Sequence, residues 1–225
     1  MPNATFSRRF AAVVLPLMLA AAGCAHNPPA RKINVAGQTL TSSIFPVGTL
    51  AFGPTFEYVG GTQFVLYGVA DCEIHVFAQV KDRKVQRFYW VQFEGYLPSE
   101  PTRTYDYSRD PKDLLVGGQA FHTRGNFVSA EEGRKNLRPG SDREAVLRLF
   151  DQKGYVLDQD MMFVRLVRLD ESRRRELLIV YSEPLAPLGL TAQALALGGP
   201  AHPRRDELLE GLKRRVADGM VMRMN

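Results

Sequence analysis

Three consecutive segments between residues 56 and 97 have the composition of β-strands, and no other feature constrains the fold of this chain as strongly. They cover residues 62–69, 72–80 and 85–96 and are rich in β-branched and aromatic residues, which favour strands. The polar residues 81–84 have the length of a hairpin connection. In the middle segment Cys72, Ile74, Val76 and Ala78 alternate with mostly polar residues. Because side chains alternate between the two faces of a strand, this segment predicts a β-meander with one buried face.

Further elements are expected on both sides of this meander. Short apolar pieces in residues 33–56 are interrupted by proline and glycine, and they indicate short edge strands or a crossing loop. Ser141 and Glu144 have the spacing of a capping box, in which each side chain binds a backbone N–H group, and Gly154 ends the helix that they open. Strands are expected at residues 118–124, 161–169 and 176–181, and further helices from about residue 191 and at residues 203–218.

Together these elements predict one α+β domain. Its centre is a twisted antiparallel sheet of about six or seven strands, with one helix inserted between two groups of strands. C-terminal helices are expected to cover one face of this sheet, because the apolar side of a sheet must be buried against another layer.

The first 24 residues have the parts of a secretory leader. Arg8 and Arg9 supply positive charge, residues 10–22 form an uncharged, largely apolar stretch, and small residues lead into Cys24. A bilayer core takes roughly 20 apolar residues to span. The stretch is therefore expected to be the hydrophobic part of a cleaved signal and not a permanent membrane helix.

Residues 21–24, Ala-Ala-Gly-Cys, resemble the lipobox of a bacterial lipoprotein signal peptide, although that family usually has leucine at the first of these positions. The resemblance implies that residues 1–23 are removed and that Cys24 is the lipid attachment site. It also implies a place in the bacterial cell envelope, anchored in the outer membrane and facing the periplasm, since Ala25 rather than aspartate follows the cysteine. The alternatives are an uncleaved N-terminal anchor and an ordinary secreted protein.

The mature chain is expected to consist of a tether and a single domain. Residues 24–32 are mostly polar and contain two adjacent prolines, which would hold a domain away from the bilayer, and residues 33–225 form the globular part. If Cys24 carries lipid, Cys72 has no partner for a disulfide and is expected to be a small core residue. Removal of the leader, which carries two arginines and no acid, lowers the net charge from +5 to +3. That charge is too small to indicate nucleic-acid binding.

The sequence contains no G-x-S-x-G elbow, no phosphate-binding glycine loop and no H-E-x-x-H motif. The best constellation is Asp71, Glu73 and His75, which alternate along the middle strand and are of the types that bind a divalent metal. Their more ordinary interpretation is the solvent-facing polar side of a half-buried sheet. His122 and the loop residues 105–107 make a polar site only if the fold brings them together. We therefore assign no catalytic residue, no metal and no cofactor.

Aromatic side chains occupy both faces of the third strand of the meander, where Phe88 and Trp90 alternate with Tyr89 and Phe93. They indicate either a packed layer on each face or a cavity for an acyl chain or similar ligand.

Two functions follow from these observations. The first is a non-enzymatic binding or structural module at the membrane surface, attached through its lipid, whose partner is a hydrophobic ligand or an envelope protein. The second is an envelope hydrolase or metal-dependent enzyme with a site around Asp71, Glu73 and His75.

Overall fold

The computed structural model describes residues 32–225, and this part of the chain contains eleven strands, three α-helices and two short 3-10 helices. These residues belong to one compact unit. The leader, Cys24 and most of the predicted tether lie outside the described residues.

Seven strands form the larger sheet in the spatial order β4-β5-β6-β10-β9-β8-β7, and every neighbouring pair is antiparallel. The strands are β4 (Glu57–Leu66), β5 (Ala70–Lys81), β6 (Lys84–Tyr96), β7 (Leu114–Val116), β8 (Gln119–Val128), β9 (Met161–Leu169) and β10 (Arg175–Pro184). The predicted meander is confirmed as β4, β5 and β6. Along β5, Ile74, Val76 and Ala78 are fully buried on one face. The expectation of a single buried face is wrong, because His75 and Phe77 on the other face are buried as well, Phe77 against the small sheet.

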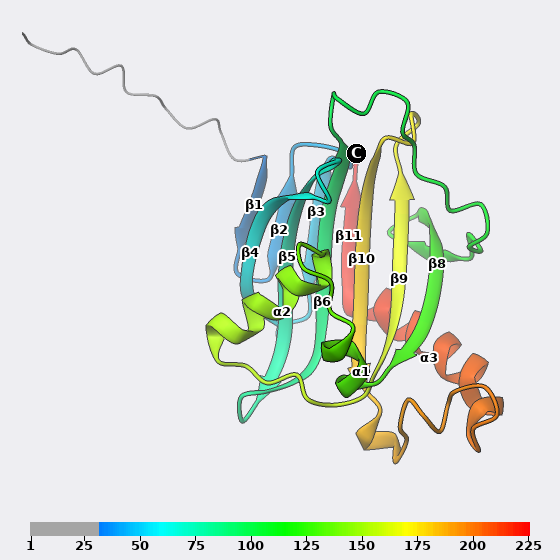
Figure 1. Cartoon of the computed structure of the whole chain (residues 1–225). Helices are drawn as coiled ribbons and strands as arrows, with labels where there is room; N and C mark the ends of the chain where they lie inside the picture. The colour runs from blue at the N-terminus through cyan, green and yellow to red at the C-terminus, as the bar shows by residue number, and fades with distance from the viewer. Residues whose placement is uncertain (1–31) are drawn as a thin grey trace, which may run out of the picture. The chain divides into compact units, whose positions relative to one another are not determined.

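A second, smaller sheet and a long helix cover one face of the larger sheet (Figure 1). The small sheet has the order β1-β2-β3-β11 and is antiparallel throughout. Its strands are β1 (Ile33–Ala36), β2 (Thr39–Ser42), β3 (Gly48–Phe52) and β11 (Met220–Met224), and the helix is α3 (Arg205–Gly219). The first three strands come from the beginning of the described chain and the fourth from its end, so the ends meet in one layer.

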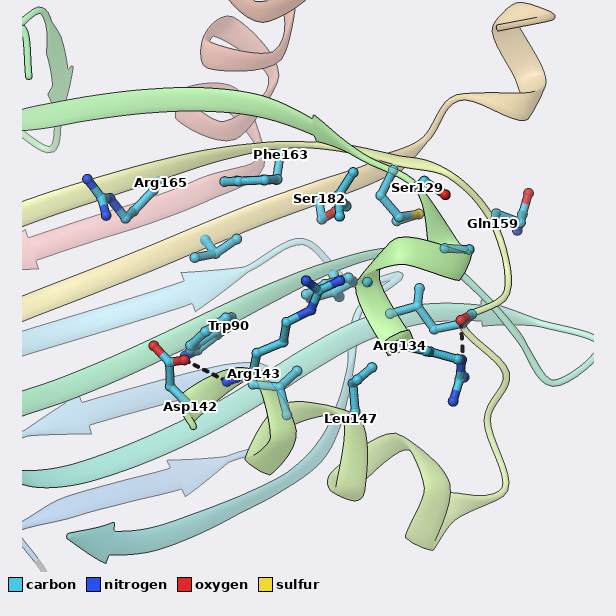
Figure 2. A pocket seen from close by; sticks show the side chains of 18 of the residues that line it. Trp90, Ser129, Arg134, Asp142, Arg143, Leu147, Gln159, Phe163, Arg165 and Ser182 are labelled. Carbon is cyan, nitrogen blue, oxygen red and sulfur yellow. Dashed lines mark hydrogen bonds between the residues drawn. The ribbon is translucent and has the colours of Figure 1, made fainter. Parts of the chain in front are cut away.

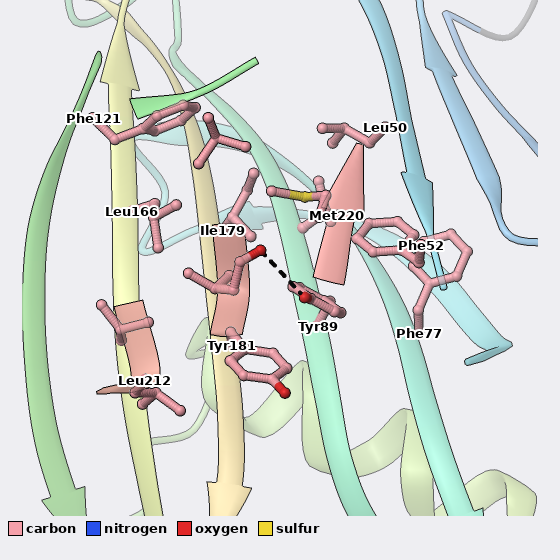
Figure 3. Close-up of a cluster of buried hydrophobic side chains, with 14 of the residues drawn as sticks. Leu50, Phe52, Phe77, Tyr89, Phe121, Leu166, Ile179, Tyr181, Leu212 and Met220 are labelled. Atoms are coloured by element: carbon pink, nitrogen blue, oxygen red, sulfur yellow. Dashed lines mark hydrogen bonds between the residues drawn. The ribbon is translucent and has the colours of Figure 1, made fainter. Parts of the chain in front are cut away.

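The main core lies between these layers (Figure 3). Phe77, Tyr89 and Ile179 from the larger sheet meet Leu50 from the small sheet and Leu212 from α3, and all five are buried. The hydroxyl of Tyr89 donates a hydrogen bond to the backbone oxygen of Val216 in α3, at 3.5 Å. Burial of this many large side chains supplies most of the free energy that holds the layers together.

Two helices lie on the opposite face of the larger sheet, and both are contributed by the chain between β8 and β9 (Figure 1). They are α1 (Ala130–Lys135) and α2 (Asp142–Lys153). Ser141 caps α2 as predicted, since its Oγ accepts a hydrogen bond from the N–H group of Glu144 at 3.2 Å. The Glu144 carboxylate accepts from the N–H group of Gly140 and not from that of Ser141. Gly154 ends the helix in the left-handed conformation, with φ of 66°.

The predicted fold class is confirmed: an α+β chain with a seven-stranded antiparallel sheet, a helical insertion and a C-terminal helix on one face. Three local expectations differ from the structure. The apolar pieces of residues 33–56 join the second sheet, and residues 220–224 form its last strand. Residues 191–200 form turns and not a helix, because Gly198, Gly199 and Pro200 interrupt any helical run there.

Candidate functional site

An apolar pocket of about 310 Å³ lies between the two inserted helices and the larger sheet (Figure 2). The sheet contributes Phe88 and Trp90 from β6, Phe163 from β9, and Leu178 and Val180 from β10. The helices, the connecting chain and the adjoining ends of β8 and β9 contribute a second apolar wall, made of Val128, Ala130, Val146, Leu147, Leu157 and Met161. A cavity of this size is at the lower end of the range found for small-molecule sites.

The pocket follows from the strand register and from the position of α2. Trp90 lies opposite Val180, and Val180 lies opposite Arg165, so three neighbouring strands each present one side chain at this level of the same face. Helix α2 packs against β4 and β5, toward one edge of the sheet. Space therefore remains above β6, β10 and β9, and α1 closes over it.

Arg143, in the first turn of α2, extends its guanidinium into this space (Figure 2). Within residues 32–225 this guanidinium has neither an ion pair nor a hydrogen bond. A Cβ atom at Gly133 of α1 would overlap it, so the glycine provides the room that the side chain occupies. Burial lowers the pKa of Arg143, and the neighbouring Asp142 carboxylate opposes that shift. The guanidinium stays charged, which leaves an unpaired cation in an apolar pocket.

Arg165 lies at the edge of the same pocket and is only partly used by the protein. Its Nη2 donates a hydrogen bond to Asp110 at 2.6 Å, and its guanidinium carbon lies 5.0 Å from the centre of the Tyr107 ring. Its Nε is buried, and no atom of the described residues accepts a hydrogen bond from it. Such buried unpaired donors are rare in native proteins.

Next to the pocket, the same face of the sheet carries a row of buried polar groups. The indole N–H of Trp90 donates to the Gln92 side-chain oxygen at 3.0 Å, and the Gln92 amide donates to the Glu94 carboxylate. Glu94 lies directly opposite Glu176 on the neighbouring strand. Residues paired in this way have Cα atoms about 4.5–5.5 Å apart, so two carboxyl groups lie side by side within the sheet.

Two tyrosines of the connection between β6 and β7 close over these carboxyl groups. The hydroxyl of Tyr105 donates to Glu94 at 2.8 Å and the hydroxyl of Tyr107 donates to Glu176 at 2.9 Å. Burial and the nearby charge of Glu94 raise the pKa of Glu176 to about 8, and burial also raises the pKa of Glu94. Two adjacent carboxyl groups cannot both ionise cheaply in such a place, so Glu176 keeps its proton at neutral pH. The hydrogen bonds from the two tyrosines to the two carboxyl groups hold the connecting loop on the sheet.

The structure brings Glu73 and His75 together on one face of β5, as their spacing predicts. The His75 Nε2 atom is 3.0 Å from the Glu73 carboxylate, and the Tyr58 hydroxyl is 3.0 Å from His75 Nδ1. Asp71 is exposed, as a solvent-facing position requires, whereas the expectation of solvent exposure is wrong for His75, which is 7% exposed. Tyr58 from the neighbouring strand β4 covers the imidazole. Among the residues that the structure describes, no group of three or more His, Cys, Asp or Glu could hold a metal ion.

His122 lies on β8, on the opposite face of the sheet from His75, with β6, β10 and β9 between their strands. The fold does bring it close to part of the loop named with it. Its ring centre is 6.3 Å from that of Tyr107, and both residues line a second pocket together with Asp106. Tyr105 is directed elsewhere, to Glu94.

Cys72 is 3% exposed and packs beneath α2 with Ile74 and Phe150. Burial raises the pKa of its thiol far above the ordinary value, so it stays protonated and unreactive. The expectation of a small core residue is confirmed, and Cys72 is a free cysteine.

The residues that sequence reasoning missed are Arg143, Arg165, Glu94 and Glu176. A signal for three of them was present, because Glu94, Arg165 and Glu176 are charged positions inside otherwise apolar strands. Arg143 gave no such signal, since a cation in the first turn of a helix is ordinarily solvated.

No protein-family model matches the chain, and no curated protein or solved structure matches it either. Within residues 32–225 no helix has the length and apolar character needed to cross a bilayer.

Proposed function

We propose that this protein binds a small amphipathic ligand, with an apolar body and an anionic head, in the pocket between α1, α2 and the larger sheet. The observation that carries the proposal is the unpaired guanidinium of Arg143 inside a largely apolar cavity. The proposal makes the protein a binding module and not an enzyme.

An unpaired charge in an apolar place is costly, and a ligand anion would offset that cost. Hydrogen bonds between a guanidinium and a carboxylate are short, paired and roughly twice as strong as neutral ones. Arg143 offers its donors to such an oxyanion, and Arg165, at the edge of the pocket, adds positive charge. Asp142 lies beside them, and burial raises the pKa of its carboxyl group, which weakens its competition with a ligand anion.

The size of the cavity suggests the length of the apolar part. One water molecule takes up about 30 Å³ of liquid water. A cavity of about 310 Å³ therefore holds on the order of ten non-hydrogen atoms. A medium-chain carboxylate such as decanoate has that size and the required charge. Its tail would lie against Phe88, Phe163 and Val180.

The test uses Trp90, the chain's single tryptophan, which lines the pocket and reports on its contents by fluorescence. We expect decanoate, kept below its micelle concentration, to change this fluorescence saturably. Decyltrimethylammonium, with the same tail and the opposite charge, should bind at least about tenfold more weakly. Arg143→Met should weaken decanoate binding about 10- to 100-fold, the effect expected for loss of a buried charge-assisted pair.

The matched control is Arg148→Met, since Arg148 lies on the same helix and its side chain is exposed. It should bind decanoate as the unaltered protein does. Equal affinity for the cationic and anionic probes, or normal decanoate binding by Arg143→Met, would overturn the anionic head. Absence of any saturable response to either probe, by fluorescence and by calorimetry, would overturn ligand binding in this pocket.

We further propose that the protein is a lipoprotein of the cell envelope, anchored through Cys24 to the outer membrane and facing the periplasm. The support is the leader sequence and its resemblance to a lipobox. Cys24→Ser is expected to shift the protein from the membrane to the soluble fraction, because Cys24 would carry the acyl chains that make anchoring stable. Cys72→Ser is the matched control and should leave fractionation unchanged. Full sedimentation of Cys24→Ser with membranes would show that the anchor is elsewhere.

A further inference from the structure

Tyr58, His75 and Glu73 are joined by hydrogen bonds on the face of the larger sheet opposite the apolar pocket. The Tyr58 hydroxyl is 3.0 Å from Nδ1 of His75, and Nε2 of the same ring is 3.0 Å from the Glu73 carboxylate. The three residues come from the neighbouring strands β4 and β5. None of them lines the apolar pocket, so the ligand proposed above does not account for this cluster.

The direction of these hydrogen bonds follows from the chemistry of the groups. A carboxylate only accepts hydrogen bonds, so the proton of the neutral imidazole is on Nε2 and is donated to Glu73. Nδ1 then has a lone pair, and the Tyr58 hydroxyl donates its proton to it. The amide of Gln63, directly opposite Glu73 on β4, donates to the other carboxylate oxygen at 2.8 Å and holds the carboxylate in place.

Gly61 provides the room in which the phenol and the imidazole meet. It lies opposite His75 in the strand register. A Cβ atom on Gly61 would be 2.7 Å from the Tyr58 hydroxyl oxygen and 2.8 Å from His75 Nδ1, closer than real Cβ atoms approach other heavy atoms. Any other residue at this position would therefore separate the hydroxyl from the imidazole.

The phenol is open to solvent, whereas the imidazole beneath it is not. Tyr58 belongs to β4, the edge strand of the larger sheet, and is 37% exposed, but His75 is 7% exposed. The Tyr58 ring packs against that of Phe77, with 5.1 Å between their centres, and this contact restricts its orientation. A reagent in solution can therefore approach Tyr58 while His75 stays in place behind it.

A hydroxyl, an imidazole and a carboxylate in this order activate the hydroxyl for attack on a carbonyl carbon. We propose that Tyr58 is a modification site, which accepts an acyl group from an activated ester. The phenol oxygen attacks the carbonyl carbon while its proton passes to His75 Nδ1, and the Glu73 carboxylate stabilises the imidazolium. The bond between the carbonyl carbon and the leaving oxygen then breaks, and the imidazolium gives its proton to that oxygen. The products are O-acyltyrosine and a free alcohol or phenol, with one acyl group on each chain.

The test is reaction of the purified protein with p-nitrophenyl acetate, followed by peptide mass spectrometry to measure the rate of acetylation at each tyrosine. Tyr67 is the internal control, because it is 58% exposed and its hydroxyl makes no hydrogen bond within residues 32–225. We expect Tyr58 to be acetylated at least about tenfold faster than Tyr67, since a positioned base typically contributes more than this factor. A smaller difference, or faster reaction of Tyr67, would overturn the proposal.

Two variants then separate activation by the imidazole from simple exposure of the phenol. His75→Gln can still accept from Tyr58 and donate to Glu73, but it removes the base, so acetylation of Tyr58 should slow at least about tenfold. Gly61→Ala keeps all three side chains and should also slow this acetylation, because the added methyl group displaces the hydroxyl from Nδ1. The rate at Tyr67 should stay the same in both variants. Unchanged acetylation of Tyr58 in folded His75→Gln would overturn the proposal, and if that variant does not fold, Gly61→Ala decides in the same way.

Discussion

Glu176→Gln is expected to raise the free energy of unfolding at about pH 8 and to flatten its dependence on pH. In the folded protein, burial and the charge of Glu94 raise the pKa of Glu176 to about 8, from an ordinary value of 4.5. Between these two values the folded chain holds a proton that the unfolded chain has released. Stability from this group is therefore complete below about pH 4.5 and is lost as the pH rises through about 8.

We expect this loss of unfolding free energy in the unaltered protein to be about 2–4 kcal/mol. Its upper limit is the whole pKa shift multiplied by about 1.4 kcal/mol for each pKa unit. Glutamine has the shape of the protonated carboxyl group and still accepts a hydrogen bond from Tyr107. It cannot ionise, so the variant keeps its stability where the unaltered protein loses it.

Urea denaturation at several pH values between about 5 and 8.5 measures the difference. Glu171→Gln is the matched control, because Glu171 is exposed in the β9–β10 hairpin, and it should reproduce the pH dependence of the unaltered protein. An unchanged slope in Glu176→Gln would mean that Glu176 is ionised in the folded state and that the arrangement beneath Tyr107 differs from the one described.

Most of the larger sheet could be predicted from the sequence because six of its strands have nine or more residues, whereas β7, with three residues, could not. The alternation along β5 selects Ile74, Val76 and Ala78 for burial, but it does not show that His75 and Phe77 on the other face are buried too. The helix that begins after Ser141 was equally readable, since its start and its end at Gly154 are local signals.

The smaller sheet was not readable because its information is non-local. Its strands have four or five residues, too few to establish a period, and β3 pairs with β11 from the far end of the chain. A strand this short can be recognised only when its partner strand is known. The pairing of residues so far apart in the chain produces no pattern in the sequence around either strand.

The candidate site was unreadable for a related reason. Glu94 and Glu176 interact because strand register places them opposite each other, although some 80 residues separate them in the chain. The meaning of Arg143 depends on a guanidinium that makes no ion pair and no hydrogen bond within the described residues, which only the packed structure shows. The aromatic residues Phe88 and Trp90 were correctly connected with a cavity, but they also pack, so both interpretations of that strand hold on its helical face.

Leu212→Ala is expected to lower the free energy of unfolding by about 2–5 kcal/mol, the range measured for loss of a fully buried leucine. Leu212 has no exposed surface and belongs to the same core as Leu166 and Tyr181 (Figure 3). Leu212 attaches α3 to the larger sheet, so a cavity at this position weakens the contact between the larger sheet and the layer formed by α3 and the small sheet. The midpoint of thermal unfolding should fall by about 5–15 °C for a domain of this size.

Leu197→Ala is the matched control, because Leu197 is 91% exposed and its removal should change stability by no more than about 0.5 kcal/mol. Equal stability of the two variants would contradict the packing of α3 against the sheet. The apolar pocket lies on the opposite face of that sheet, across β9 and β10 from Leu212. Decanoate should therefore bind folded Leu212→Ala as it binds the unaltered protein, and a parallel loss of binding would show that the two faces are coupled through the strands between them.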